Sequence, residues 1–326
     1  MRRAVLLTVV IFASVVVFAA NDGPPPAWAY GFSSPLTATA AAAVATPAPD
    51  VTPRQLPGSS GSFTLAQIRD GFGPADWFPG DHPPMPEIVA RGKRPDVRAC
   101  SLCHYPTGKG RPENAGITGL PVAYFVQTMA DFKNEVRKSA DSRKGNTNLM
   151  IAYAKAMSDA EVKAAAEYFA AMKWTPWIKV VEAAVVPRTR IAGGMFLRLD
   201  DHATEPIGER IIEVPDDTER TEILRDPRSG FTAYVPVGSI KKGESLVTTG
   251  AGRTTRCAVC HGADLKGLGP VPGIAGRSPS YTVRQLFDTQ RGTRTGVWAD
   301  LMKPVVANLT NDDMLAIAAF TASRTP

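Results

Sequence analysis

The sequence contains two copies of one segment, and this duplication is the feature that most constrains its fold. Shifting the chain by 157 positions places Cys100–His104 on Cys257–His261 without a gap. Matched residues continue past this pentapeptide as far as Asp131, which falls on Asp288. Five residues are then missing from the second copy, and at an offset of 152 Met150 falls on Met302. A chain of 326 residues has room for two or three domains, so the repeat predicts two homologous domains.

Both copies end in a pattern typical of an amphipathic helix. Ser158–Glu161 forms a capping box, and Thr310–Asp313 imitates one with a shorter acid. Apolar residues then recur at three- and four-residue steps: Val162, Ala165, Ala166 and Phe169 in the first copy, and Met314, Ile317 and Ala318 in the second. We also expect a middle helix from Tyr124 and from Tyr281. In the first copy, closely spaced prolines limit any helix before Cys100 to a short turn near Glu87 to Arg91.

The segment between the copies differs from them in residue types and in charge. It is rich in β-branched and aromatic residues, which predict strands at Val180-Val181, Val185-Val186, Arg210–Val214 and Phe231–Val235. Residues 175–240 carry a side-chain charge of about −3, whereas 86–174 and 241–326 each carry about +5. The predicted fold is therefore mainly α, with two tandem domains joined by an insertion that contains some β-strand.

The N-terminus predicts export. Positive charge at Arg2 and Arg3 precedes an apolar run, Ala4–Ala20, and an Ala27-Trp28-Ala29 site follows. We expect a leader over 1–29, cleaved after Ala29, and a periplasmic protein. The alternative is an uncleaved membrane anchor, because the apolar run is near the lower limit for spanning a bilayer.

The remaining boundaries follow from composition and from the repeat. Residues 30–60 are rich in Ala and Pro and read as a flexible linker. The first domain, with an N-terminal extension, occupies 61–174, the insertion occupies 175–240 and the second domain occupies 241–326. The net charge of +6 is distributed without a Lys/Arg block and interleaved aromatic residues, so nucleic-acid binding is not expected.

The repeated pentapeptide has the form Cys-x-x-Cys-His, the attachment sequence of c-type haem. Its two thiolates add to the haem vinyl groups and the adjacent histidine reaches the iron. Cys100, Cys103 and His104 therefore predict one covalent haem c, and Cys257, Cys260 and His261 a second. The alternatives are a four-cysteine zinc site or disulfides. Zinc gives no reason for a histidine after both cysteine pairs, for an export signal, or for the duplication.

Met150 and Met302 are the candidates for the second axial ligand of each iron. Each lies eight residues before its helix cap, Ser158 or Thr310, and we expect it in a loop that reaches back across the haem. Thioether sulfur suits iron in this role. Met157, Met172 and Met314 read as core residues on helix stripes. We expect surface roles for His82 and His202, with replacement of a methionine ligand as the alternative. For Lys109, Lys266, Arg277 and Arg284 we consider either propionate pairing or simple solvation.

These features together resemble the two-domain dihaem cytochromes c, built from two class I cytochrome c folds. Besides the pentapeptides, the resemblance rests on Gly116–Gly119, Gly273–Gly276, Tyr281–Asp288 and Met302–Val305. It covers roughly 86–174 and 241–326. It implies that the two histidines are proximal ligands, that the two methionines are distal ligands, and that the Gly-Ile loops press on the haem edges. The long insertion departs from the short linker usual in that family.

The expected function is transfer of single electrons between exported or membrane redox partners, without conversion of a substrate. A donor and an acceptor, such as a dehydrogenase and a terminal oxidase, would be the partners. Two alternatives remain at this point. A dihaem peroxidase would need an open or displaceable site at one iron, and a haem subunit of a dehydrogenase complex would use 175–240 for docking.

Overall fold

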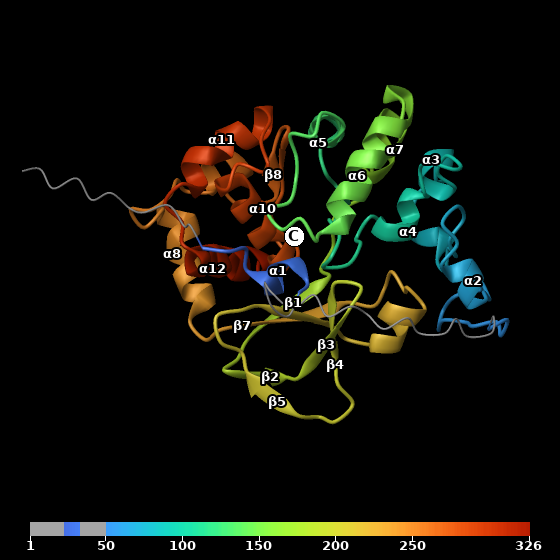
Figure 1. The fold of residues 1–326 in the computed structure, drawn as a ribbon, viewed down its shortest axis with the longest axis horizontal. Helices are drawn as coiled ribbons and strands as arrows, with labels where there is room; N and C mark the ends of the chain where they lie inside the picture. Colours follow the sequence, from blue (N-terminus) through green and yellow to red (C-terminus); the bar gives the residue numbers. More distant parts are fainter. Residues whose placement is uncertain (1–22, 33–49) are drawn as a thin grey trace, which may run out of the picture.

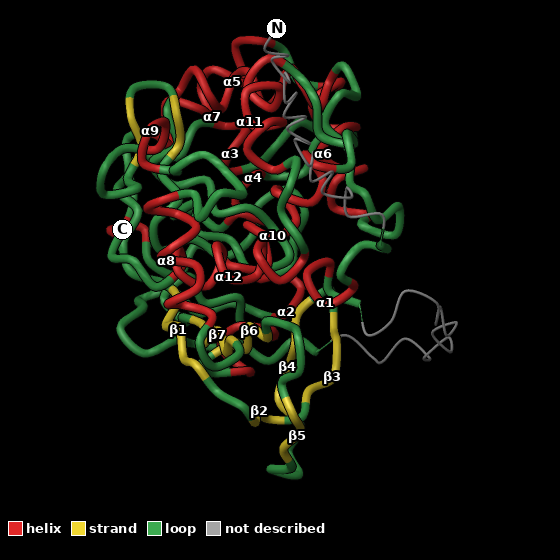
Figure 2. The backbone as a smooth tube through the Cα atoms, turned by 90° about the vertical axis from the view of Figure 1, so that its left-hand side faces the viewer, coloured by secondary structure: helices red, strands yellow, loops and turns green. Residues whose placement is uncertain are grey.

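Two helical domains lie side by side above a layer of short strands in the computed structural model, which describes residues 23–32 and 50–326 (Figure 1). The strands β1–β7 stay at the lower end of the molecule when it is turned by 90° (Figure 2). The predicted mainly α fold with a stranded insertion is confirmed. Residues 1–22 of the expected leader (1–29) and residues 33–49 of the expected linker (30–60) lie outside the described residues. None of the described helices is long and apolar enough to span a bilayer.

The two domains repeat one series of five helices. In the first domain these are α3 (Glu87–Ala90), α4 (Cys100–His104), α5 (Val122–Lys133), α6 (Gly145–Ala156) and α7 (Asp159–Ala170). In the second they are α8 (Ser239–Thr249), α9 (Ala258–His261), α10 (Pro279–Gln290), α11 (Val297–Val306) and α12 (Asn311–Ala322), with the short strands β8 (Gly267–Leu268) and β9 (Val271–Pro272) after α9. The capping boxes expected at Ser158 and Thr310 are both formed.

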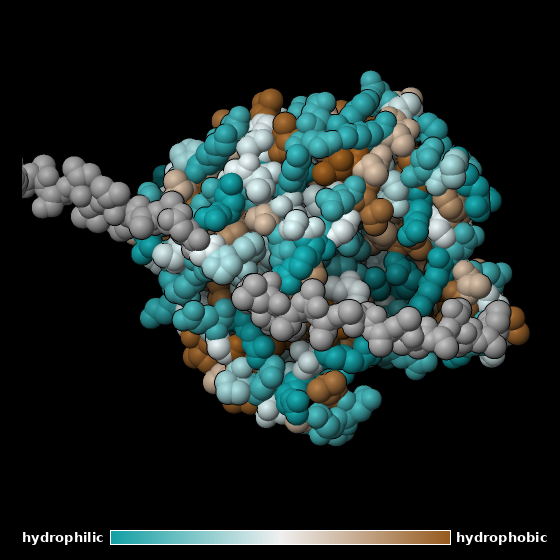
Figure 3. All heavy atoms as spheres, in the orientation of Figure 1, coloured by the Kyte–Doolittle hydropathy of each residue, from teal (hydrophilic) through white to brown (hydrophobic). Residues whose placement is uncertain are grey.

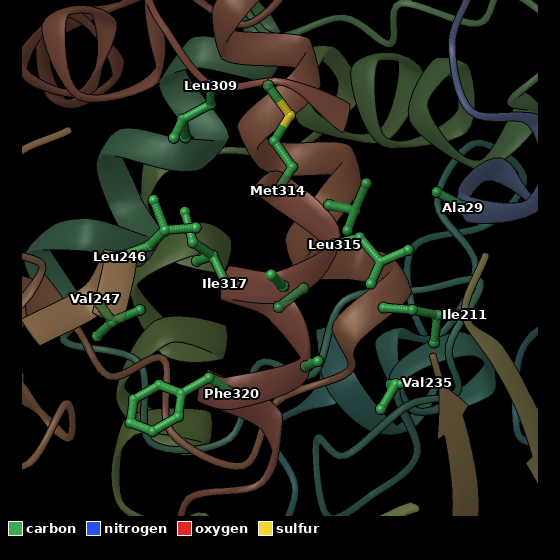
Figure 4. Close-up of a cluster of buried hydrophobic side chains, with 14 of the residues drawn as sticks. Ala29, Ile211, Val235, Leu246, Val247, Leu309, Met314, Leu315, Ile317 and Phe320 are labelled. Carbon is green, nitrogen blue, oxygen red and sulfur yellow. The ribbon is translucent and has the colours of Figure 1, made fainter. Parts of the chain in front are cut away.

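The second domain is built around the crossing of α8 and α12. A Cβ atom added to Gly243 of α8 would lie 1.9 Å from the carbonyl oxygen of Ala316, so only glycine permits this approach. Leu246 and Val247 of α8 pack with Ile317 and Phe320 of α12 (Figure 4). The first domain has only the four-residue α3 at the equivalent place, as its prolines predict, and α3 packs against α4 and α7.

The N-terminal extension packs against the insertion. It contains α2 (Leu65–Ile68) and the 3₁₀ turn η1 (Pro79–Asp81). The indole Nε1 of Trp77 donates a hydrogen bond to the carbonyl oxygen of Leu224, at 2.7 Å. Leu56 is buried in the same cluster. Residues 50–60 are therefore part of the packed structure, and the predicted flexible linker does not extend to residue 60. Burial of Leu56 holds this segment in place although its composition is typical of a loop.

The insertion contains seven short strands and a π-helical turn. They are β1 (Ile178–Glu182), β2 (Val185–Pro187), β3 (Thr189–Ala192), β4 (Met195–Arg198), β5 (Thr204–Pro206), β6 (Ile212–Pro215), η2 (Glu219–Ile223) and β7 (Phe231–Val235). One sheet has the order β1-β7-β6, in which β7 is parallel to β1 and antiparallel to β6. Two antiparallel pairs, β2 with β5 and β3 with β4, complete the layer. The predicted strand segments all lie in or next to these strands.

A short helix near the N-terminus, α1 (Ala27–Tyr30), lies between the two domains and packs on α10 (Figure 1). Ala29 and Tyr30 are completely buried. The Tyr30 hydroxyl donates to Oδ1 of Asp288 at 2.6 Å, and the Tyr30 carbonyl accepts from Nζ of Lys144 at 3.3 Å. A guanidinium nitrogen of Arg284 donates to the Ala29 carbonyl. This helix is thus a structural part of the contact between the domains.

We expect the exported protein to retain Ala27–Tyr30. Cleavage after Ala29, at the site that the sequence suggests, would remove the carbonyl that accepts from Arg284 and would place a charged amino group at buried Tyr30. Intact-mass and N-terminal peptide analysis of the purified exported protein should therefore find an N-terminus that precedes Ala27. A mature chain that begins at Tyr30 would contradict this assignment.

Candidate functional site

The first pentapeptide helix forms one wall of a cavity of about 550 Å³, a volume typical of cofactor pockets. Cys100, Cys103 and His104 of α4 line it, and Met150 of α6 lines it as well. Most of the remaining wall is apolar, from Ile117, Leu120, Phe125, Met129, Phe132, Met157 and Phe169. The residues predicted to hold the first haem therefore meet at one cavity whose lining suits a flat apolar group.

Both histidines of the pentapeptides are held in one orientation by a backbone carbonyl. Nδ1 of His104 lies 2.9 Å from the Ala115 oxygen, and Nδ1 of His261 lies 2.8 Å from the Pro272 oxygen. Ala115 and Pro272 occupy the same position of the repeat. Because a carbonyl only accepts, each Nδ1 carries the proton and each Nε2 keeps a lone pair for a metal. Burial lowers the pKa of both imidazoles, which favours this neutral form.

The four cysteines are free thiols in two separate pairs. Burial, reinforced by the neighbouring thiol Cys103, raises the pKa of Cys100 to about 12, and burial raises that of Cys257 to about 11. The pairs do not come together: the described residues, which include every cysteine and histidine, contain no group of three or more His, Cys, Asp and Glu side chains able to hold a metal ion. The disulfide and four-cysteine zinc alternatives thus have no counterpart in this arrangement.

The two candidate methionines lie in helices, so the prediction of a loop is wrong. Met150 is in the middle of α6 and Met302 is in α11, which continues through Pro304. The segment before Ser158, residues 145–157, contains three alanines, two methionines and one leucine, residue types that favour helix over loop. Met302 packs against the same apolar cluster as Cys257 and Ile274 of its own domain.

The other methionines are packing residues, as the sequence suggests, with one addition. Met314 is fully buried in α12, and Met172 packs against the core of the first domain. Met157 is buried too, but it also lines the cavity of His104. Four methionines line this cavity, Met129, Met150, Met157 and Met195. The lining alone therefore does not select one sulfur, and the repeat selects Met150.

The domains meet through a reciprocal contact that the sequence reasoning missed. Arg137 donates to the Tyr281 hydroxyl at 3.0 Å, and Arg294 donates to the Tyr124 hydroxyl at 2.8 Å. Both guanidinium groups also donate to Oε1 of Gln285, each at 2.9 Å. Burial opposes ionisation of Tyr124, but the charges of Arg294 and Arg137 outweigh it and lower the tyrosine pKa.

This contact adjoins the first haem cavity. Tyr124, Arg137, Tyr281 and Gln285 all line the cavity of His104, so its wall includes residues of the second domain. Arg137 and Arg294 are separated by 157 positions, the offset of the repeat. That match was the signal in the sequence that could have revealed them.

The two arginines considered as propionate partners make hydrogen bonds within the protein. Arg277 donates to the carbonyls of Gly116 and Thr118 in the first domain, at 2.7 and 2.9 Å. Arg284 donates to the Pro112 carbonyl at 2.7 Å. Both side chains are buried and tie the domains together, so simple solvation is excluded for them.

The two lysines considered with these arginines make single contacts. Nζ of Lys109 lies 4.9 Å from the ring centre of Trp177. Nζ of Lys266 donates to the Pro326 carbonyl at 3.1 Å.

His82 corrects a further expectation. Its ring is only 4% exposed, pairs with Asp76 at 3.1 Å and bonds the Pro83 carbonyl at 2.8 Å. Burial lowers its pKa, but the hydrogen bonds to Asp76 and Pro83 and the nearby carboxylates outweigh it and leave the pKa raised. It is thus a structural residue of the N-terminal extension. His202 is exposed, as expected.

Comparison with known proteins places this site in a family. No protein-family model matches the chain. A segment of 69 residues, 21% of the chain, is 36% identical to cytochrome c-554(548) of Halomonas halodenitrificans and covers 83% of that protein. The chain belongs to the c-type cytochromes. It is a two-domain dihaem cytochrome c that carries two covalently bound haem c groups and transfers electrons.

Longer but weaker similarities extend over most of the chain. This cytochrome is 25% identical over 234 residues, 71% of its length, to a protein of Thiomonas intermedia named thiosulfate dehydrogenase electron acceptor, of which it covers 80%. Other curated relatives are matched over only 36% of their own length. Cytochrome c4 of Acidithiobacillus ferrooxidans superposes with a TM-score of 0.44 at 22% identity, covering 69% of this chain and 98% of that one.

Proposed function

We propose that this cytochrome is an exported electron carrier in which His104 with Met150 and His261 with Met302 are the axial ligands of the two haem irons. The observation that carries the proposal is the cavity at which Cys100, Cys103, His104 and Met150 meet. Haem iron supplies the one-electron couple when bound. A thioether opposite a histidine is the ligand set of carriers with high reduction potential.

The chain prepares each site in the same way. The carbonyls of Ala115 and Pro272 fix the histidine rings before any ligand is bound, so little rearrangement is needed when a metal is coordinated. The apolar part of the wall of the first cavity would exclude water from a haem held by His104. The fixed histidine rings and the apolar wall would both limit the rearrangement that follows a change of charge at the site. Fast electron exchange requires this rearrangement to be small.

The contact between the domains supports exchange of electrons within the molecule. The cavity of His104 is lined by Tyr281 and Gln285 of the second domain as well as by Tyr124 and Arg137 of the first. The first haem would therefore lie directly against the second domain. Export is consistent with the same role, since the apolar leader predicts a periplasmic protein. The proposed division of the mature chain keeps the domain limits 61–174, 175–240 and 241–326.

Substituting Met150 tests the ligand assignment. Met150→Ala should open the first iron, retain both covalent haems and remove about half of the methionine-to-iron charge-transfer absorption, since one of two such bonds is lost. Met157→Ala is the matched control because Met157 lines the same cavity, and it should keep the full band. Loss of the band in the Met157 variant alone would reassign the ligand. An open iron in the wild type would favour the dihaem peroxidase.

We further propose that the electron donor is a dehydrogenase. Two relatives are named as electron acceptors of thiosulfate dehydrogenase. The second domain exposes four large apolar side chains, each more than half exposed: Val259 in α9, Leu268 in β8, and Val297 and Leu301 in the helix of Met302. We propose that the donor docks on these side chains. The face seen in Figure 3 is mostly hydrophilic, with hydrophobic residues in small separate patches. Transient redox partners use small contacts of this kind.

A charge placed on this surface should slow reduction by the donor. With thiosulfate dehydrogenase and thiosulfate as the reducing system, Val297→Asp should lower the second-order reduction rate roughly tenfold, because a desolvated aspartate opposes docking. Val237→Asp is the control, since Val237 is 70% exposed and Val297 68%. Stopped-flow absorbance measures both rates. Equal rates for the two variants and the wild type would place docking elsewhere, and no reduction of the wild type would reject this donor.

A further inference from the structure

The insertion forms one wall of the first haem cavity. Ala192, Gly193 and Met195 of the β3–β4 hairpin line it, as do Glu222 and Arg225 at the end of η2. The hairpin turn is in close contact with the first domain: a Cβ atom on Gly194 would lie 3.1 Å from Cβ of Glu113 and 3.6 Å from Nζ of Lys144. The insertion is therefore part of one haem site as well as the link between domains.

Arg225 brings a positive charge to this wall. Its guanidinium donates to the Leu102 carbonyl, inside the Cys100–His104 helix, and lies 5.8 Å from the ring centre of Tyr105. The residue adopts a φ of 54°, a conformation that costs energy for a side chain other than glycine. The fold thus holds this arginine against the pentapeptide helix in a strained backbone conformation.

The charge of Arg225 is not cancelled by a partner. The neighbouring acids are already paired: Asp226 with Arg220 at 2.5 Å, and Glu222 with Arg190 at 3.0 Å. Arg111 and Glu113, also on the cavity, pair with each other at 2.6 Å. Within the described part of the chain, Arg225 has no ion-pair partner within 4.0 Å. A net positive charge therefore remains beside the first site.

Among residues 23–32 and 50–326, no equivalent segment covers the pentapeptide of the second domain. Leu102 and Val259 occupy the same position of the repeat, yet Leu102 is 8% exposed and Val259 55%. Cys260 is likewise exposed, whereas Cys103 is half-buried. Two sites with the same ligand set thus differ in the element that covers one of them.

We propose that Arg225, held by the insertion against the Cys100–His104 helix, is a positioning residue that raises the reduction potential of the first haem. The proposal rests on the proposed His/Met function and adds its regulation. Ferric haem carries one more positive charge than ferrous haem, so a nearby uncompensated cation disfavours the oxidised form. The insertion then has a redox role, because it makes two homologous haems unequal.

The test is a spectroelectrochemical titration of the full-length holoprotein. Arg225→Gln keeps a donor for the Leu102 carbonyl but removes the charge, and it should lower the potential of the first haem while that of the second stays unchanged. Arg225→Lys keeps the charge and should restore the wild-type value. The matched control is Arg228→Gln, because Arg228 lies in the same loop but pairs with Asp81 and stacks on Phe78, away from the cavity. Met150→His identifies the first-haem wave, since replacing thioether by imidazole lowers its potential.

Each outcome decides the proposal. A potential that is unchanged in Arg225→Gln, or lowered equally in Arg228→Gln, overturns it. Should Arg225→Gln fail to fold with both haems, Arg225→Met removes the same charge with an apolar side chain of similar length and must lower the first potential, and no change there also overturns it. Two His/Met haems in the wild type with no response to Arg225 would reject this inference alone. A wild type without two such haems would reject the proposed function itself.

Discussion

The paired arginines between α5 and α10 are the interaction on which the rest of the structure depends. Each domain donates one guanidinium to a tyrosine of the other, and Gln285 accepts from both. Backbone hydrogen bonds join the same segments, from Lys138 to Thr293 and from Thr295 to Val136. Buried charges are tolerated only where such partners satisfy them. The contact therefore fixes the relative position of the domains, and it lies on the wall of the first haem cavity.

The duplication explains the symmetry of this contact. The insertion and the N-terminal extension explain why the two domains differ elsewhere. The α8–α12 crossing at Gly243 gives the second domain a long first helix, whereas α3 in the first domain is a single turn. The N-terminal extension and the insertion cover the first domain instead, through Trp77 with Leu224 and through the hairpin at Gly194. Two equal modules have thus become one shielded and one more accessible site, a division that suits a carrier with a single external contact surface.

The repeat with its Cys-x-x-Cys-His spacing was sufficient to predict two tandem domains and two covalent haems, and the runs of β-branched and aromatic residues predicted the strands of the insertion. Both are local patterns that one sequence displays. Contacts across the molecule were less readable. The orienting carbonyls of Ala115 and Pro272 belong to residues with no distinctive side chain, and nothing near Arg225 or Tyr30 in the sequence indicates that they meet residues more than a hundred positions away. The helical position of Met150 was not predicted, because the cap at Ser158 was taken as the beginning of the last helix and the residues before it as a loop. The structure has a separate helix, α6, in front of that cap.

The most direct test of the central claim is the optical spectrum of the purified exported protein, oxidised and then reduced, together with a pyridine haemochrome count. The proposed ligand pairs, His104 with Met150 and His261 with Met302, predict two covalent haems per chain. Both should be low-spin and show methionine-to-iron absorption when oxidised. One haem per chain, or a high-spin iron that binds peroxide, would contradict the account of a dihaem electron carrier with two His/Met sites.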